Sequence, residues 1–252
     1  VFFYDITTSK IPMKQLFDAT AVPTPPWIVL QEDTEPDWMQ RIGTPLIVKP
    51  AVSAGSLGLS VQNVVQTETA LKQVLNKMHE GYHGWKLDDS GILIERYIAG
   101  REFTTFLTGS AHQPEHIHFY TPVERVFHPS LPPEERFLSF DRLWETYEEE
   151  SPMPGQGYFY EYAAVTDANL LAALEHISLH AYTALQGRGY TRMDFRQDED
   201  GKLYVLEANA QCGLSEDEDY TSIGAILRVS GISFTAMIAE VLEDALRRHE
   251  AH

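Results

Sequence analysis

Two apolar segments near the carboxyl end carry charged and amide side chains at alternate positions. YTRMDF contains Arg192 and Asp194, and YVLEAN contains Glu207 and Asn209. Asp200-Gly201 between them is typical of a two-residue hairpin turn. With that turn, Asp194 lies opposite Glu207, and Arg192 lies opposite Asn209 on the same face. The other face is then expected to carry the apolar residues Met193, Phe195, Leu206 and Ala208.

This arrangement opposes two carboxylates, which repel each other. At a separation of about 5 Å and an effective dielectric constant of about 20, the repulsion is roughly 3 kcal/mol. A shared proton would relieve it. A divalent cation would also relieve it, because carboxylate and amide oxygens are the ligands that Mg²⁺ or Mn²⁺ takes. The alternative is a surface hairpin in which Arg192 simply pairs with Glu207. The hairpin sequence alone does not decide between a metal site and this ion pair.

A lysine and a run of small residues form a second candidate site. Lys49 ends the apolar segment LIVKP and precedes AVSAGSLG. An ammonium group followed by backbone N–H groups of small residues can bind phosphate oxygens. The GxxxxGK[ST] order of a Walker A loop is absent. An ordinary surface lysine before a flexible turn is the alternative.

Two glutamates stand in the segment ILIERYIAGREFTTF, which is otherwise largely apolar. Glu95 follows a run of aliphatic residues, and Glu102 follows the Ala99-Gly100 break. A carboxylate at these places can accept hydrogen bonds from the amino group of a nucleotide base or from ribose hydroxyls. The alternative is that the two glutamates pair with their sequence neighbours Arg96 and Arg101.

Hydrophobic periodicity predicts the elements that position these groups. Helices are expected over residues 10–21, 67–82, 165–189, 220–231 and 233–250. Strands are expected within 22–30, 44–50, 91–110, 115–127, 190–197 and 202–209. Residues 128–157 carry five prolines and are interpreted as a long excursion of the kind that serves as a lid. Strands mixed with helices, without strict β-α-β alternation, indicate an α+β protein.

Composition narrows the classes of partner. The 252 residues include 19 basic and 37 acidic ones, for a net charge of −18, so a nucleic-acid partner is not expected. No apolar run is long enough to span a bilayer, so no membrane partner is expected either. Cys212 is the only cysteine, which excludes an intrachain disulfide and fits a reducing, cytoplasmic location. No base is evident that would make it a nucleophile.

Three segments together resemble a known superfamily. VKPAVSAGSLGLS, ILIERYIAGREFT and RMDF…LYVLEANAQCGLS, in this order, resemble the ATP-grasp superfamily, and within it the D-alanine–D-alanine ligases and related carboxylate–amine ligases. The resemblance runs from about Lys10 to the last helix. It implies an ATP-grasp fold with ATP and Mg²⁺ or Mn²⁺ between two α+β lobes, here residues 1–92 as the small lobe and 93–252 as the large lobe with the metal site.

The resemblance also implies a role for each candidate residue. ATP phosphates would be bound by Lys14, Lys49 and Ser56, the last as its loop closes over them. Adenine would be held by a hinge of Glu95, Arg96, Tyr97 and Ile98, and ribose by Glu102. Magnesium ions would be held by Asp194, Glu207 and Asn209. Arg192 and Ser56 are the expected catalytic residues, with Arg192 stabilising the acyl-phosphate and the tetrahedral intermediate.

The implied reaction joins a carboxylate to an amine through an acyl-phosphate, with amino acids or small peptides as substrates. A catalytically impaired ATP-binding module is one alternative. Another ATP-grasp activity, a carboxylase or a phosphotransferase, is a second. A homodimer is left open.

The chain departs from the family pattern in three places. The N-terminal domain before the region matching SKIPMK is absent, so the chain is a fragment or binds its first substrate differently. FLSFDRLWETY, which matches the mobile loop, has no lysine, and Arg142 can replace the charge but not the geometry. Cys212 takes the place of a proline, and the acidic run Glu216, Asp217, Glu218 and Asp219 follows. That run would repel a carboxylate and suit a cationic amine, so D-alanine is an unexpected acceptor; a solvated acidic turn is the alternative.

Overall fold

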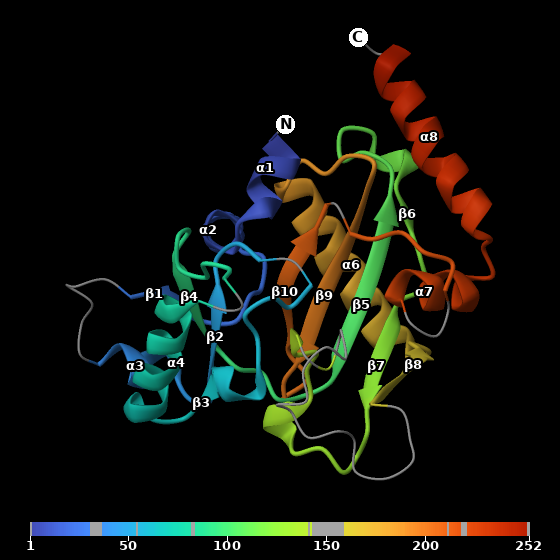
Figure 1. The fold of residues 1–252 in the computed structure, drawn as a ribbon. Coiled ribbons are helices and arrows are strands. Elements are labelled where there is room, and N and C mark those ends of the chain that lie inside the picture. Colours follow the sequence, from blue (N-terminus) through green and yellow to red (C-terminus); the bar gives the residue numbers. More distant parts are fainter. Residues whose placement is uncertain are drawn as a thin grey trace.

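Two antiparallel sheets, each with its own helices, make up the fold in the computed structural model (Figure 1). The structure describes residues 2–30, 37–53, 55–81, 84–140, 142, 159–210, 212–217 and 221–250. Figure 1 shows the smaller sheet with α3 and α4 to the left and the larger sheet with α6, α7 and α8 to the right. The mixture of helices with antiparallel strands confirms the α+β prediction.

The smaller sheet has the strand order β1-β4-β2-β3. Its strands are β1 (Trp27–Val29), β2 (Leu46–Pro50), β3 (Val64–Val65) and β4 (Ile92–Arg96). One face packs on helix α4 (Glu68–Glu80) through Leu46, Val48 and Ile94. The helix begins where the Thr67 side chain accepts a hydrogen bond from the N–H of Ala70, as expected for an N-cap threonine. The short helix α3 (Trp38–Ile42) packs against the same cluster.

The larger sheet has the order β10-β9-β5-β7-β8, and β6 also pairs with β5. Its strands are β5 (Glu102–Thr108), β6 (His118–Phe119), β7 (Val123–Phe127), β8 (Tyr160–Ala164), β9 (Tyr190–Gln197) and β10 (Leu203–Asn209). Every residue of β5 is buried, because both faces of the sheet are covered. Phe103 and Leu107 pack with α6 (Ala168–Ala184), whereas Phe106 packs with α7 (Ser222–Ser230) and α8 (Phe234–Glu250).

Helices α1 (Phe2–Thr8) and α2 (Lys10–Ala19) join the core of the larger lobe through Phe3, Met13 and Phe17. The backbone N–H of Lys10 donates to Ala51 O of the smaller lobe at 2.8 Å. Helix α2 therefore contacts both lobes, and its polar side chains can pair with groups from each sheet. Ala51 follows β2 directly, where the sequence predicts a phosphate-binding loop.

Most predicted elements are confirmed, with four additions. The elements that were not predicted are helix α1, helix α3, strand β3 and strand β8, since their segments are short or follow the proline-rich excursion. The strand expected within 115–127 is wrong in part, because a 3-10 helix (Pro114–His116) precedes two separate strands, β6 and β7. Two further 3-10 turns span Val61–Asn63 and Pro133–Glu135. Of the excursion 128–157, residues 141 and 143–157 lie outside the described residues.

The β9–β10 hairpin has the predicted register at one end only. Glu207 pairs with Asp194 and Asn209 with Arg192, as expected. Nearer the turn the two-residue prediction is wrong, because Val205 pairs with Phe195, so that a β-bulge at Leu206 separates the two registers. A bulge adds one residue to one strand and shifts all later pairs by one position. Val205 therefore occupies the core position that was expected for Leu206.

The two sheets are joined between Arg96 and Glu102. This connection lies a few residues after the predicted division into 1–92 and 93–252, which stays a prediction. Within the described ranges no single helix has the length and apolar character of a membrane span; α7 and α8 reach them only as a pair bent by 98°. Six of the nine residues of α7 are buried within the protein.

Candidate nucleotide and metal site

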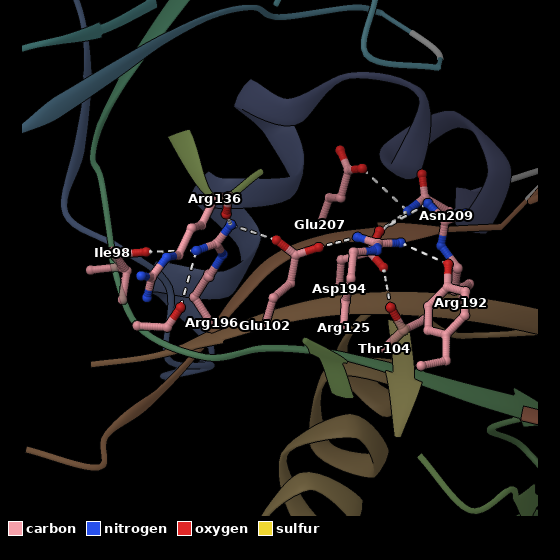
Figure 2. A network of polar contacts seen from close by, with 12 residues as sticks. Ile98, Glu102, Thr104, Arg125, Arg136, Arg192, Asp194, Arg196, Glu207 and Asn209 are labelled. Carbon is pink, nitrogen blue, oxygen red and sulfur yellow. Dashed lines mark hydrogen bonds and ion pairs between the residues drawn. The ribbon is translucent and has the colours of Figure 1, made fainter. Parts of the chain in front are cut away.

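The β9–β10 hairpin places its four predicted polar side chains next to one another (Figure 2). Arg192 Nη2 donates to Asp194 Oδ2 at 2.9 Å, and Asn209 Nδ2 donates to the same oxygen at 3.2 Å. Asn209 Nδ2 also reaches Glu207 Oε1 at 3.4 Å. The other oxygen of Asp194 accepts from the Thr104 hydroxyl of β5 at 3.1 Å. Strands β5, β9 and β10 thus contribute to one polar cluster on the face opposite α6.

Burial and opposed charges shift the two carboxylates of this cluster. Burial raises the pKa of Asp194; Arg192 lowers it and the facing Glu207 raises it, so it lies above its ordinary value. Burial also acts to raise the pKa of Glu207, but Lys10 and Arg192 outweigh it, and that pKa is lowered. Lys10 Nζ lies 3.6 Å from Glu207 Oε2. Ionisation of both carboxylates at once is therefore disfavoured in the free protein. A divalent cation bound between them would favour it.

The alternative in which Arg192 pairs with Glu207 is wrong, because Arg192 pairs with Asp194. The side chains of Asp194 and Glu207 are 15% and 30% exposed, so this face of the hairpin is partly buried and can still be reached by a ligand. No group of three or more His, Cys, Asp and Glu side chains within the described residues could hold a metal ion. Two carboxylates and an amide oxygen fit Mg²⁺, which keeps waters and phosphate oxygens as its other ligands. The metal assignment stays a prediction.

A second cluster is built around Glu95 of β4, which is 1% exposed. Lys49 Nζ of β2 lies 2.5 Å from Glu95 Oε2, and Lys14 Nζ of α2 contacts Oε1. Burial acts to raise the pKa of Glu95, but the two ammonium groups lower it to about 2. Burial lowers the pKa of Lys14, and Glu95 only partly restores it. The structure therefore brings together three predicted nucleotide ligands, with two cations around one anion.

Two arginines that are distant in sequence surround Glu102 of β5, which is 6% exposed. Arg125 of β7 contacts Glu102 Oε1, and Arg196 Nη2 of β9 lies 2.5 Å from Oε2. The alternative in which Glu102 pairs with Arg101 is wrong, since Arg101 pairs with Glu124 instead. The alternative in which Glu95 pairs with Arg96 is wrong as well, because Glu95 binds the two lysines.

Sequence reasoning missed Arg125. It lies opposite Glu102 across the β5–β7 pairing, and its side chain is 10% exposed. Its Nη2 donates to the Tyr162 hydroxyl at 3.1 Å, and Asp194 is among the groups that raise its pKa against the effect of burial. An arginine in an alternating strand is a weak signal without the strand partner, which only the sheet order supplies.

The connection between the sheets contains the predicted hinge. Tyr97 is buried, packs edge-on against Phe137 and donates from its hydroxyl to Pro133 O at 2.9 Å. Arg96 is exposed. The carbonyl of Ile98 accepts from Arg196 Nη1 at 3.3 Å. The hinge thus contacts both β9 and the segment around Pro133, and its role in binding adenine stays a prediction.

Ser56 lies in the loop after β2, where Gly55, Ser56 and Gly58 have φ values of 56°, 61° and 79°. A left-handed φ is strained for Ser56, which carries a side chain, and backbone strain of this kind is found at ligand-binding loops. Within the described residues no hydrogen bond joins the Ser56 side chain to the lysines. Its roles in catalysis and phosphate binding stay predictions.

Within the described residues, the contacts of Arg142 are with other groups than the hairpin cluster. Its Nη2 donates to Glu135 Oε2 at 2.6 Å, and its guanidinium lies 4.9 Å from the centre of the Phe159 ring. These contacts do not support even a substitution of the loop lysine's charge by Arg142.

The segment after β10 contains the remaining predicted groups. Cys212 is buried, and burial raises the pKa of its thiol to about 11, so a thiolate is disfavoured. Glu216 and Asp217 are exposed, while Glu218 and Asp219 lie outside the described residues. The preference of the acidic run for a cationic amine stays a prediction.

Comparison with known proteins gives consistent similarities. A family model described as "D-ala D-ala ligase C-terminus" matches residues 16–243. A D-alanine–D-alanine ligase of Synechococcus sp. (strain JA-3-3Ab) is 29% identical over 260 residues, covering 96% of this chain and 66% of the relative. The chain therefore spans just under two thirds of the length of that relative.

Solved structures show the same fold. The D-alanine–D-alanine ligase of Bacillus anthracis complexed with ATP aligns with a TM-score of 0.70 at 21% identity, covering 98% of this chain and 68% of that one. The VanG D-Ala:D-Ser ligase of Enterococcus faecalis aligns with a TM-score of 0.67 at 17% identity, covering 95% and 62%. These similarities confirm the predicted fold, in which two α+β lobes face each other.

Proposed function

The chain belongs to the family of D-Ala–D-Ala ligase C-terminal regions, and from this premise we propose that it acts as an ATP- and Mg²⁺-dependent carboxylate–amine ligase. A substrate carboxylate oxygen attacks the γ-phosphorus of ATP, the bond to ADP breaks, and an acyl-phosphate forms. An amine nitrogen then attacks the carbonyl carbon, phosphate leaves, the amine loses a proton and an amide results. The substrates proposed are amino acids or small peptides.

The observation that carries this proposal is the hairpin cluster of Arg192, Asp194, Glu207 and Asn209. Asp194, Glu207 and Asn209 would hold Mg²⁺, which when bound neutralises phosphate charge. Asn209 at present directs its amide nitrogen at both carboxylates, so it would turn its oxygen to the cation. Each carboxylate has a cationic partner, Arg192 for Asp194 and Lys10 for Glu207.

Arg192 has a further donor for the reaction. Its Nε is buried and has no hydrogen-bond partner among the described residues, while its Nη2 is held by Asp194. A buried donor without a partner is costly, and an anionic oxygen would satisfy it. We assign Arg192 to charge that develops on the acyl-phosphate and the tetrahedral intermediate, where a fixed donor lowers the barrier.

Lys14 and Lys49 are proposed to bind the nucleotide phosphates. Two lysine side chains contact the one carboxylate of Glu95. A phosphate anion would oppose the burial that lowers the pKa of Lys14. Glu95 holds both ammonium groups in place, which removes the cost of ordering two flexible side chains when phosphate arrives. The strained loop at Ser56 is proposed to cover the phosphates.

The test measures ADP formation with panels of amino acids and dipeptides, ATP and Mg²⁺, with product mass as the second readout. Wild-type protein is expected to give ADP and an amide product. Asp194→Asn is expected to abolish both, while Asp200→Asn, the same change at the exposed turn of the same hairpin, leaves them unchanged. Equal activity in Asp194→Asn would reject the proposed site.

A second function is favoured by one observation. Residues 128–157 contain no lysine. Among the contacts of the described residues, Arg142 donates to Glu135 and Arg136 to Leu131 O, and neither arginine is joined to the proposed phosphate lysines. A nucleotide-binding module without turnover is therefore the second candidate. ATP binding without ADP formation by any substrate pair would select it. A phosphorylated or carboxylated product would instead indicate another ATP-grasp activity.

A further inference from the structure

Arg196 lies on β9 on the same face as Arg192 and Asp194, two residues beyond Asp194. It is 2% exposed, and its guanidinium lies 5.6 Å and 5.7 Å from the ring centres of Tyr97 and Phe127. The proposed function assigns it no role, although a buried guanidinium is expensive to place and needs several acceptors. The hydrogen-bond acceptors of Arg196 therefore indicate its role in the protein.

Arg196 donates to four acceptors from three segments. Its Nη1 lies 3.3 Å from Ile98 O and 3.1 Å from Gly100 O, both in the connection between the sheets. Its Nη2 lies 2.5 Å from Glu102 Oε2 and also contacts Arg136 O. Figure 2 shows these contacts around one side chain. Arg196 thus ties the hinge to Glu102 and to the segment that follows Pro133.

Two of these acceptors are the groups proposed to receive a nucleotide. The carbonyl of Ile98 belongs to the adenine-binding hinge, and Glu102 is the ribose carboxylate. Both are hydrogen-bond acceptors, and a base amino group or a ribose hydroxyl would compete with Arg196 for them. Glu102 is also held by Arg125, so it keeps a cationic partner when Arg196 leaves.

The backbone of the connection between the sheets is held close to β9. This limits how far the hinge itself can move when a nucleotide binds. A Cβ atom added to Gly100 would lie 1.8 Å from Gln197 O, so the backbone of the connection already touches the strand that carries Arg196. Gln197 N donates to Arg101 O at 2.9 Å. The hinge therefore cannot move away from β9 without breaking backbone contacts, whereas a side chain can rotate.

We propose that Arg196 occupies the nucleotide acceptors of the free protein and must release them when ATP binds, so that it sets nucleotide affinity. The inference rests on the proposed function, because that function identifies the hinge and Glu102 as nucleotide ligands. A protein whose binding-competent state is a fraction of the population binds more weakly by that fraction. Removing the competing guanidinium raises that fraction and strengthens ATP binding.

Arg196→Met tests this, since methionine is similar in length to the aliphatic part of arginine and has no donor. The dissociation constant of ATP with Mg²⁺, measured by calorimetry, is expected to fall at least about tenfold. Arg101→Met is the matched control: Arg101 pairs with Glu124 and is 52% exposed, so its loss leaves the constant unchanged. Circular dichroism and urea unfolding establish that each variant is folded. Unchanged or weaker binding in Arg196→Met overturns the inference.

A second variant and a second readout cover the case in which Arg196→Met does not fold. Arg196→Lys keeps the charge beside Glu102 but lacks the planar fork that reaches several acceptors, so a smaller gain in affinity is expected. In the unsubstituted chain, the Arg196 guanidinium resonance, assigned by its loss in Arg196→Lys, is expected to shift on addition of ATP. A resonance that does not change while ATP binds overturns the inference. Absence of nucleotide binding in every form rejects the proposed function as well.

Discussion

Lys49 and Glu95 form a buried ion pair across neighbouring strands, with Nζ 2.5 Å from Oε2. Glu95 pairs in register with Ile47, so Lys49, two residues along β2, lies diagonally across the same face. Lys14 of α2 contacts the other carboxylate oxygen. One carboxylate therefore links β2, β4 and α2, and it fixes both lysines that are proposed to bind phosphate.

Glu95→Gln is expected to lower the free energy of unfolding by about 3–5 kcal/mol, because removing one partner leaves buried charges without compensation. Urea denaturation at pH 7 measures the change. Glu124→Gln is the matched control, since Glu124 pairs with Arg101, which is 52% exposed, and its loss should cost at most about 1 kcal/mol. Equal losses in the two variants would show that Glu95 does not stabilise the lobe through its lysines.

The low pKa of Glu95 predicts that the free energy of unfolding depends on pH. Burial acts to raise the pKa of Glu95, but Lys14 and Lys49 lower it to about 2, from an ordinary value of 4.5. Its contribution to stability is therefore complete above pH 4.5 and is lost as the pH falls towards 2. Between pH 7 and pH 4, the difference in unfolding free energy between wild type and Glu95→Gln should shrink by roughly 1 kcal/mol. A difference that is constant over this range would contradict the low pKa.

The sequence predicts the functional end of the β9–β10 hairpin correctly although the predicted turn is wrong. A two-residue turn pairs Asp194 with Glu207, and the structure has that pair. Near the turn the strands are offset by one residue, and the bulge at Leu206 restores the register. Alternation and turn residues identify a hairpin, but a bulge depends on tertiary packing, here on burial of Val205 in the core.

The partners of the buried glutamates are the part of the site that could not be predicted from the sequence. Adjacent arginines are natural partners for Glu95 and Glu102 when only the chain is considered, yet both glutamates point to groups on other elements. Arg125 reaches Glu102 because β7 lies beside β5, and Lys14 reaches Glu95 because α2 contacts both lobes. Strand order and helix docking decide these contacts, and no local pattern encodes them.

Glu207→Gln is expected to weaken metal binding while changing stability little. The substitution removes an oxygen ligand but also removes the opposition between two carboxylates, so the two effects on the free protein offset each other. Mn²⁺ binding in the presence of ATP, followed by electron paramagnetic resonance, should weaken at least about tenfold. The free energy of unfolding should stay within about 1 kcal/mol of wild type.

Glu199→Gln at the exposed turn of the hairpin is the control and should bind Mn²⁺ like wild type. Undiminished Mn²⁺ binding in Glu207→Gln would remove the hairpin from the metal site. A large loss of stability would instead show that Glu207 serves mainly as the partner of Lys10.

Cys212 is expected to be unreactive in the native protein. It is 7% exposed, and burial raises the pKa of its thiol to about 11. At pH 8 the thiolate fraction is then about 100-fold below that of an unfolded chain, and limited access slows the reaction further. Labelling with a disulfide reagent should therefore be at least about 100-fold slower in buffer than in urea. Cys212→Ser should keep ADP formation, because no step of the proposed reaction uses the thiol. Rapid labelling together with an inactive Cys212→Ser would instead identify a nucleophile beside Arg192 and require a covalent mechanism.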